Sequence, residues 1–180
     1  MTAQPANSPD LTEFAPAKVN LFLHLLNKQT DGYHQLQSLF VFADQVGDVL
    51  EFSDQGDAIK LDVFGEEAEC LQQEAVKTNL VYRALELLAE VSGEHRRLAG
   101  QYRLVKNLPV ASGIGGGSSD AAAALRLGNS LLDSPLSNAD LNELALSLGA
   151  DVPACLTPTA QWISGIGEIR HPIEHWDKIP

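Results

Sequence analysis

The sequence lacks an excess of positive charge, because its 180 residues carry 12 Lys and Arg against 24 Asp and Glu, a formal net charge of −12. Proteins that bind nucleic acids neutralise backbone phosphates with clustered Lys and Arg, so this balance argues against a nucleic-acid partner.

Cysteine is also scarce. Cys70 and Cys155 stand too far apart for a zinc pattern or a disulfide framework. Both fit free thiols in a reducing compartment, and we expect a cytoplasmic protein.

Long hydrophobic runs are missing too. No apolar stretch reaches 18 residues, and the first residues lack the basic and apolar segments of a signal peptide. The sequence therefore predicts neither a membrane span nor a leader. Hydrophobic residues nevertheless make up 44% of the chain, with no long block of like charge, which is typical of a folded domain with a core. Residues 1–12 are rich in polar residues and proline, and we expect a disordered tail there.

Strand patterns dominate the first third of the chain, and helical patterns follow. Alternating, β-branched and aromatic residues predict strands at 17–26, 37–43, 48–53 and 58–64, with a turn at 28–32 and a link at 44–47. Apolar periodicity predicts helices from 79 to a stop at Gly93, at 119–132 and at 137–148. A short strand is expected at 101–106, and strand and turn at 160–173. This order predicts an α+β fold with a largely antiparallel sheet.

A glycine-rich segment leads into the second helix: Leu108–Ala124 reads LPVASGIGGGSSDAAAA. Glycine lets backbone N–H groups approach an anion, and a helix start adds unpaired N–H donors and the positive end of a dipole. Such a segment predicts an anion site, to which Ser118 and Ser119 can add hydroxyl contacts, and one of them or Asp120 can cap the helix. No lysine follows the glycines, which excludes a Walker A loop, and Ser118 replaces the last glycine of a Rossmann fingerprint. Taken alone, the segment also fits a flexible loop before a serine-capped helix.

Three segments in a fixed order give this loop a context. Ala15-Pro-Ala-Lys18-Val-Asn20, the glycine segment and Gly149-Ala-Asp151-Val-Pro153 together resemble the GHMP kinases. The resemblance implies an α+β N-terminal domain over residues 13–160, with a ribosomal protein S5 domain 2-like sheet and helices on one side. It also implies transfer of phosphate from ATP, with Mg²⁺, to an alcohol. Residues 161–180 would then begin or connect to a C-terminal domain whose remainder is absent from this chain.

The resemblance assigns roles to the residues that match the family's motifs. Asp151 corresponds to the catalytic base, and Lys18 to the cation that favours its ionised form. Without the resemblance, Asp151 equally fits a turn before a proline, and Lys18 a lysine that reaches solvent at a sheet edge. The residues expected to hold ATP are Lys106, Pro109, Val110, Ala111, Ser112, Gly113, Ile114, Gly115, Gly116, Gly117, Ser118 and Ser119.

The substrate side is expected near Asn20, which lies two residues from Lys18 on the same face of a strand. The segment Asp31-Gly-Tyr33-His34 resembles the branch of the family that phosphorylates 4-diphosphocytidyl-2-C-methyl-D-erythritol in the non-mevalonate isoprenoid pathway, where Tyr33 and His34 would flank the cytosine. A homoserine-type or mevalonate-type kinase is the alternative, although stacking aromatics suit a small acyclic alcohol poorly. A nucleotide-binding fragment without catalysis is a third possibility. Ser164 replaces an acidic residue expected before Gly165, and we assign no metal ligand.

Overall fold

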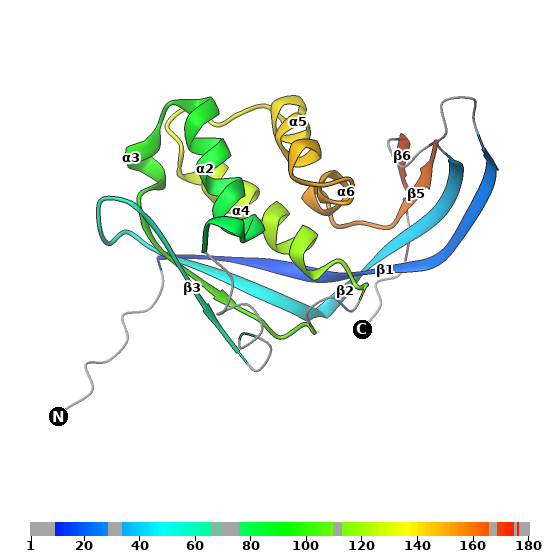
Figure 1. The fold of residues 1–180 in the computed structure, drawn as a ribbon, viewed down its shortest axis with the longest axis horizontal. Helices are drawn as coiled ribbons and strands as arrows, with labels where there is room; N and C mark the ends of the chain where they lie inside the picture. Colours follow the sequence, from blue (N-terminus) through cyan, green and yellow to red (C-terminus); the bar gives the residue numbers. More distant parts are fainter. Residues whose placement is uncertain are drawn as a thin grey trace.

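The structure, a computed structural model, describes residues 10–28, 34–65, 68, 76–109, 113–165, 169–174 and 176. Its strands form one six-stranded sheet, and the helices lie together on one face of it (Figure 1). The strands are β1 (Leu11–Lys28), β2 (His34–Ser53), β3 (Ile59–Phe64), β4 (Gly100–Val105), β5 (Gln161–Ser164) and β6 (Ile169–Pro172). The helices are η2 (Val76–Thr78), α2 (Leu80–Ser92), α3 (His95–Leu98), α4 (Gly116–Leu131), α5 (Asn138–Leu148) and α6 (Val152–Leu156). The expected α+β class, with helices on one side of the sheet, is confirmed.

The long strand β2 organises the sheet. β1 pairs with it antiparallel from Leu11 opposite Phe52 to Lys28 opposite His34. The other edge of β2 pairs with two shorter strands. β4 pairs with residues 49–53 of β2, and β5 pairs with residues 38–40. β3 pairs with β4 in the parallel direction, and β6 pairs with β5 in the antiparallel direction. The sheet is therefore largely antiparallel, as expected, with one parallel pair.

Several expected boundaries differ from those in the structure. β2 is one continuous strand, although the sequence predicted two strands joined by a link at 44–47. The predicted link is a bulge within β2: residues 43–46 lie opposite a single residue of β1, between the pairs Lys18–Phe42 and Pro16–Gly47. β1 begins at Leu11, inside the segment expected to be a tail, while residues 1–9 lie outside the described residues, as do residues 29–32 of the expected turn. The N-terminal domain was expected to end at residue 160. β5, which follows that residue, pairs with β2 and is part of the same sheet.

Local signals set the helix ends. The Asn79 side chain caps α2 by accepting a hydrogen bond from the Val81 amide, and Gly93 ends that helix in the left-handed conformation. Ser137 and Asp140 form a capping box at the start of α5, as their spacing predicts. Within the described residues, no helix has the length and apolar content that a membrane crossing requires.

The core lies between the sheet and the helices, and α4 runs through its centre. Ala121–Leu125 are fully buried, and Gly128 lets α2 come close, since a Cβ at that position would lie 2.7 Å from the Leu88 Cδ2 atom. On the sheet side, Leu50, Phe52 and Tyr102 complete the core. Burying apolar area is the main stabilising contribution in such a domain, about 25 cal/mol per Å². The packing of α4 therefore fixes its first turn, where the glycine segment ends.

Candidate active site

The glycine segment ends in a helix start that exposes backbone amides. Gly113 and Gly115 have φ of +77° and +69°, a region that favours glycine, and Gly115 is the N-cap of α4. The Ser119 amide donates to the Gly115 carbonyl at 2.9 Å, which leaves the amides of residues 116–118 without an intrahelical acceptor. The helix thus begins three residues earlier than expected. This places Gly116 and Gly117 in its first turn, at the positive end of its dipole.

A lysine and an aspartate meet beside this helix start. Lys18 on β1 is 2% exposed, and its Nζ lies 3.0 Å from Oδ2 of Asp151, whose side chain is 47% exposed. The same ammonium donates to Asn20 Oδ1 at 2.9 Å and lies 3.8 Å above the Phe40 ring. The lysine is therefore held by three neighbours, while the carboxylate stays open to solvent. The structure brings together Lys18, Asn20 and Asp151, as the sequence predicted.

The loop and the ion pair form one continuous site. The Lys18 amide donates to the Ile114 carbonyl at 2.9 Å, and a Cβ on Gly115 would lie 2.8 Å from Lys18 Cε. Only glycine permits both this approach and the left-handed backbone at position 115. Ile114 and Gly115 therefore lie directly against the lysine that faces Asp151.

Ser119 was expected to contact the phosphates, but its side chain has another contact. The Ser119 hydroxyl is buried and donates to the Pro16 carbonyl at 2.6 Å, which ties α4 to β1. Neither Ser119 nor Asp120 caps the helix, because no side chain makes a capping hydrogen bond there. Cys155 is buried next to this contact, and burial raises the pKa of its thiol to about 11, so the thiol remains protonated at neutral pH.

Lys106 lies beneath the loop instead of facing outward. Its ammonium is ion-paired with Asp48 on β2 and, at 2.8 Å, with Asp120 on α4. Burial lowers the pKa of Lys106, but the two carboxylates outweigh this and raise it. Burial raises the pKa of Asp120 to about 7, although Lys106 opposes the shift. In this structure both carboxylates therefore hold the Lys106 ammonium, and the contact of Lys106 with ATP stays a prediction.

Sequence reasoning missed Asp48 and assigned Asp120 only as a possible cap. A signal was available, because Lys106, Asp48 and Asp120 each stand next to apolar residues where a buried charge requires a partner. Nothing in the sequence alone pairs them.

The structure describes some of the other expected site residues and not others. Among those described, Pro109 and Gly113 are exposed, and Ile114, Gly116 and Ser118 are partly exposed. Among the described residues, no group of three or more His, Cys, Asp or Glu side chains could hold a metal ion. The residues that lie outside the described part are Tyr33, Val110, Ala111 and Ser112, together with the side chain of His34.

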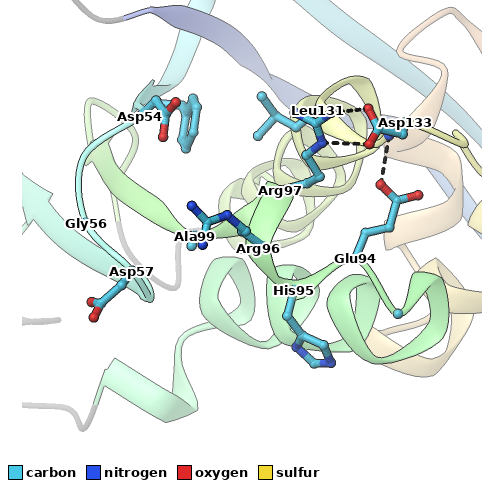
Figure 2. A pocket seen from close by; sticks show the side chains of 12 residues that line it. Asp54, Gly56, Asp57, Glu94, His95, Arg96, Arg97, Ala99, Leu131 and Asp133 are labelled. Carbon is cyan, nitrogen blue, oxygen red and sulfur yellow. Dashed lines mark hydrogen bonds and ion pairs between the residues drawn. The ribbon is translucent and has the colours of Figure 1, made fainter.

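The site is distinct from a cavity of about 830 Å³ at the far end of α4 (Figure 2). That cavity lies between the turn after β2, the short helix α3 and the residues that follow α4, with Phe52, Arg97 and Asp133 among its lining. Because α4 has 16 residues, its two ends are separated by about 24 Å. None of the expected site residues lines this cavity.

Comparison with known proteins identifies the family. Residues 79–158 match the model of the GHMP kinases N terminal domain. A 4-diphosphocytidyl-2-C-methyl-D-erythritol kinase from Granulibacter bethesdensis is 50% identical over 157 residues, which cover 86% of this chain and 50% of that protein. A protein of the same name from Paramagnetospirillum magneticum is 48% identical over 158 residues, covering 88% and 53%. The crystal structure of a 4-(cytidine 5'-diphospho)-2C-methyl-D-erythritol kinase has a TM-score of 0.70 at 34% identity, covering 91% and 55%.

This chain spans about half the length of the curated relatives that it matches. The residues that match the family model include the helix start, Lys106 and Asp151, whereas Lys18 and Asn20 precede the matched range. Family model, relatives and solved structure agree. The chain belongs to the GHMP kinase family and carries its N-terminal domain.

Proposed function

We propose that the protein transfers the γ-phosphate of ATP to the 2-hydroxyl of 4-diphosphocytidyl-2-C-methyl-D-erythritol in the non-mevalonate isoprenoid pathway. One observation carries the proposal: a buried lysine holds a half-exposed carboxylate beside a helix start whose first three amides have no acceptor within the helix. The names of the relatives support the choice of substrate. A buried free thiol at Cys155 fits a reducing compartment, and we propose the cytoplasm as the location.

In this proposal Asp151 is the base. The substrate oxygen attacks the γ-phosphorus, its proton passes to the Asp151 carboxylate, and the bond from the γ-phosphorus to the bridging oxygen breaks to release ADP. Lys18 is already fixed by Asn20 and the Phe40 ring, so it orients the carboxylate without being reorganised during the reaction. Asn20, exposed beside this pair, would contact the substrate in this proposal.

The amides of residues 116–118 and the dipole of α4 would hold the triphosphate. Mg²⁺, when bound, would neutralise charge on the β- and γ-phosphates. Such ions take one or two protein oxygens and complete their shell with phosphate and water. The partly exposed Ser118 hydroxyl is an oxygen donor of this kind, so the residues present fit an ion that binds together with ATP.

An assay with three alcohols tests the choice of substrate. We expect turnover of the cytidyl substrate, and none of homoserine or mevalonate. Turnover of either small alcohol without turnover of the cytidyl substrate would favour the alternative GHMP kinases. Calorimetry that detects ATP and the cytidyl substrate binding without turnover would favour a nucleotide-binding module instead.

The catalytic assignment has its own test. Replacing the base in Asp151→Asn should lower kcat by about 10²- to 10⁴-fold. The affinity for ATP, measured by calorimetry, should remain near that of the wild type, because the variant keeps the shape of the side chain and leaves the loop intact. A kcat close to the wild-type value would contradict the role of Asp151.

A further inference from the structure

Three charged side chains form a buried cluster under the glycine loop. Asp48, Lys106 and Asp120 come from β2, from the residue after β4 and from α4, and each is at most 3% exposed. Lys106 is ion-paired with both carboxylates. Burying two carboxylates and one ammonium carries a large desolvation cost. A core of apolar residues would avoid this cost, which raises the question of what the cluster does.

The cluster contacts both ends of the loop. Oδ1 of Asp48 accepts hydrogen bonds from the amides of Asn107 at 2.6 Å and Leu108 at 2.9 Å, the residues that lead into the loop. Asp120 lies in the helix that follows the loop, and Gly116 at the start of that helix packs against the cluster. A Cβ on Gly116 would lie 3.3 Å from Lys106 Nζ and 3.7 Å from Asp48 Oδ2. Residues 109–115 connect these two points and include Gly113 and Gly115.

We propose that Asp48, Lys106 and Asp120 are positioning residues that fix the two ends of the glycine loop relative to each other, and thereby aim the amides of residues 116–118 at a phosphate. This inference rests on the proposed function only in that phosphate is the ligand of the loop. The cluster contributes through the backbone and through Gly116, since its side chains are buried beneath the loop.

The two carboxylates are not equivalent, and this makes the proposal testable. Both oxygens of Asp48 are used, Oδ2 by Lys106 and Oδ1 by the two amides. Asp120 uses only Oδ2, while its buried Oδ1 has no hydrogen-bond partner in the described part of the chain. Asp48→Asn must turn an NH₂ group toward either the ammonium or the two amides, which are all donors. Asp120→Asn can direct its oxygen to Lys106 and its NH₂ to the position where a partner is lacking.

The same chemical change at two equally buried sites should therefore have different effects. We expect Asp48→Asn to weaken ATP binding, measured by calorimetry, by about 10-fold or more. Asp120→Asn should stay within about 3-fold of the wild type, as should the exposed control Asp133→Asn. Affinity for the cytidyl substrate should be unchanged in all three, a split that a general loss of structure would not produce. Wild-type ATP affinity in Asp48→Asn, or equal losses in both cluster variants, would overturn the proposal.

Amide hydrogen exchange gives a second measurement that does not depend on ATP binding and that begins with the wild-type protein. In the wild-type protein we expect slow exchange at Asn107 and Leu108, whose amides bond to a buried carboxylate, and fast exchange there would overturn the proposal. In Asp48→Asn, exchange across residues 113–117 should accelerate relative to Asp120→Asn. Should the wild type fail to bind ATP, the proposed function fails, while these exchange rates still decide whether the cluster orders the loop.

Discussion

Two clusters of similar composition lie at opposite ends of α4. Beneath the glycine loop, Lys106 joins Asp48 and Asp120; beside the cavity in Figure 2, Arg97 pairs with Asp133, whose amide donates to Glu94 at 2.8 Å. Each cluster contains one cation and two carboxylates. They differ in burial, because Lys106 and Asp48 side chains are 4% and 0% exposed while those of Arg97 and Asp133 are 55% and 66% exposed.

This difference in exposure decides what each cluster can do. Water solvates the members of the exposed cluster whether or not they are paired, so their pairing adds little to stability. Members of the buried cluster have no water to replace a lost partner, and removing one leaves charge in a medium that solvates it poorly. A buried cluster can therefore hold backbone segments in one geometry, whereas an exposed cluster can exchange partners with solvent. We expect the site end of α4 to be much less tolerant of substitution than the cavity end.

The largest expected effect comes from removing each cation in turn. Lys106→Met leaves two carboxylates buried side by side, and the free energy of unfolding should fall by about 3–5 kcal/mol. Arg97→Met leaves an exposed carboxylate that water solvates, so its denaturation midpoint should stay close to that of the wild type. Urea denaturation of both variants at neutral pH makes the comparison. Equal losses of stability would show that burial does not distinguish the clusters.

The buried cluster should also make stability depend on pH. Burial raises the pKa of Asp120 from its ordinary value to about 7, so the native state binds a proton that the unfolded state releases near pH 4. The stabilising contribution is complete below the unfolded pKa and is lost as pH rises through about 7, a change of up to about 4 kcal/mol. Two charged side chains face Asp120: Asp48 raises its pKa further, and Lys106 lowers it.

Asp120→Asn removes the titrating group and keeps the shape of the side chain. Relative to the wild type, this variant should become more stable as pH rises from about 5 to about 8. Urea denaturation of both proteins across that range measures the difference. Parallel stability curves would exclude Asp120 as the group responsible.

Much of this architecture follows from local sequence signals. Asn79 and Gly93 delimit α2, and the Ser137-x-x-Asp140 spacing produces the expected capping box. The resemblance placed Lys18 near Asp151, and the structure has them 3.0 Å apart. Such features depend on a few neighbouring residues or on a motif shared with relatives.

The rest depends on contacts between distant segments. The start of α4 was expected at Ser119, but the helix begins at Gly116 with Gly115 as its N-cap, and the Ser119 hydroxyl donates to the Pro16 carbonyl. Lys106 was expected among the residues that hold ATP, and its ion pair with Asp48 was not expected, because nothing near it in the sequence points to Asp48. Partner choice in a buried cluster is a property of tertiary packing, which periodicity and spacing do not specify.

Two glycines allow a smaller comparison of the same two regions. Gly115 at the site and Gly93 at the cavity have φ of +69° and +72°, so alanine at either costs about 1 kcal/mol in backbone strain. Gly93 has no atom within 4 Å of an added Cβ, whereas at Gly115 Lys18 Cε would lie 2.8 Å away. We expect Gly93→Ala to keep full turnover and Gly115→Ala to lower it by up to about 100-fold through displacement of Lys18. Similar turnover in both variants would contradict the close packing of the loop on the lysine.

The smallest expected effect is a difference between the two clusters in how their contribution to stability depends on salt concentration. Exposed charges are screened over about 3 Å at 1 M salt, while buried pairs are screened much less. The small difference in stability between the wild type and Arg97→Met should therefore disappear on going from about 0.05 M to about 1 M NaCl, and that for Lys106→Met should persist. Urea denaturation at the two salt concentrations gives both differences. A difference for Arg97→Met that survived high salt would mean that its hydrogen bonds to Asp133, and the Glu94 contacts to the amides of Asp133 and Ser134, hold this end of α4 as firmly as the buried cluster holds the other.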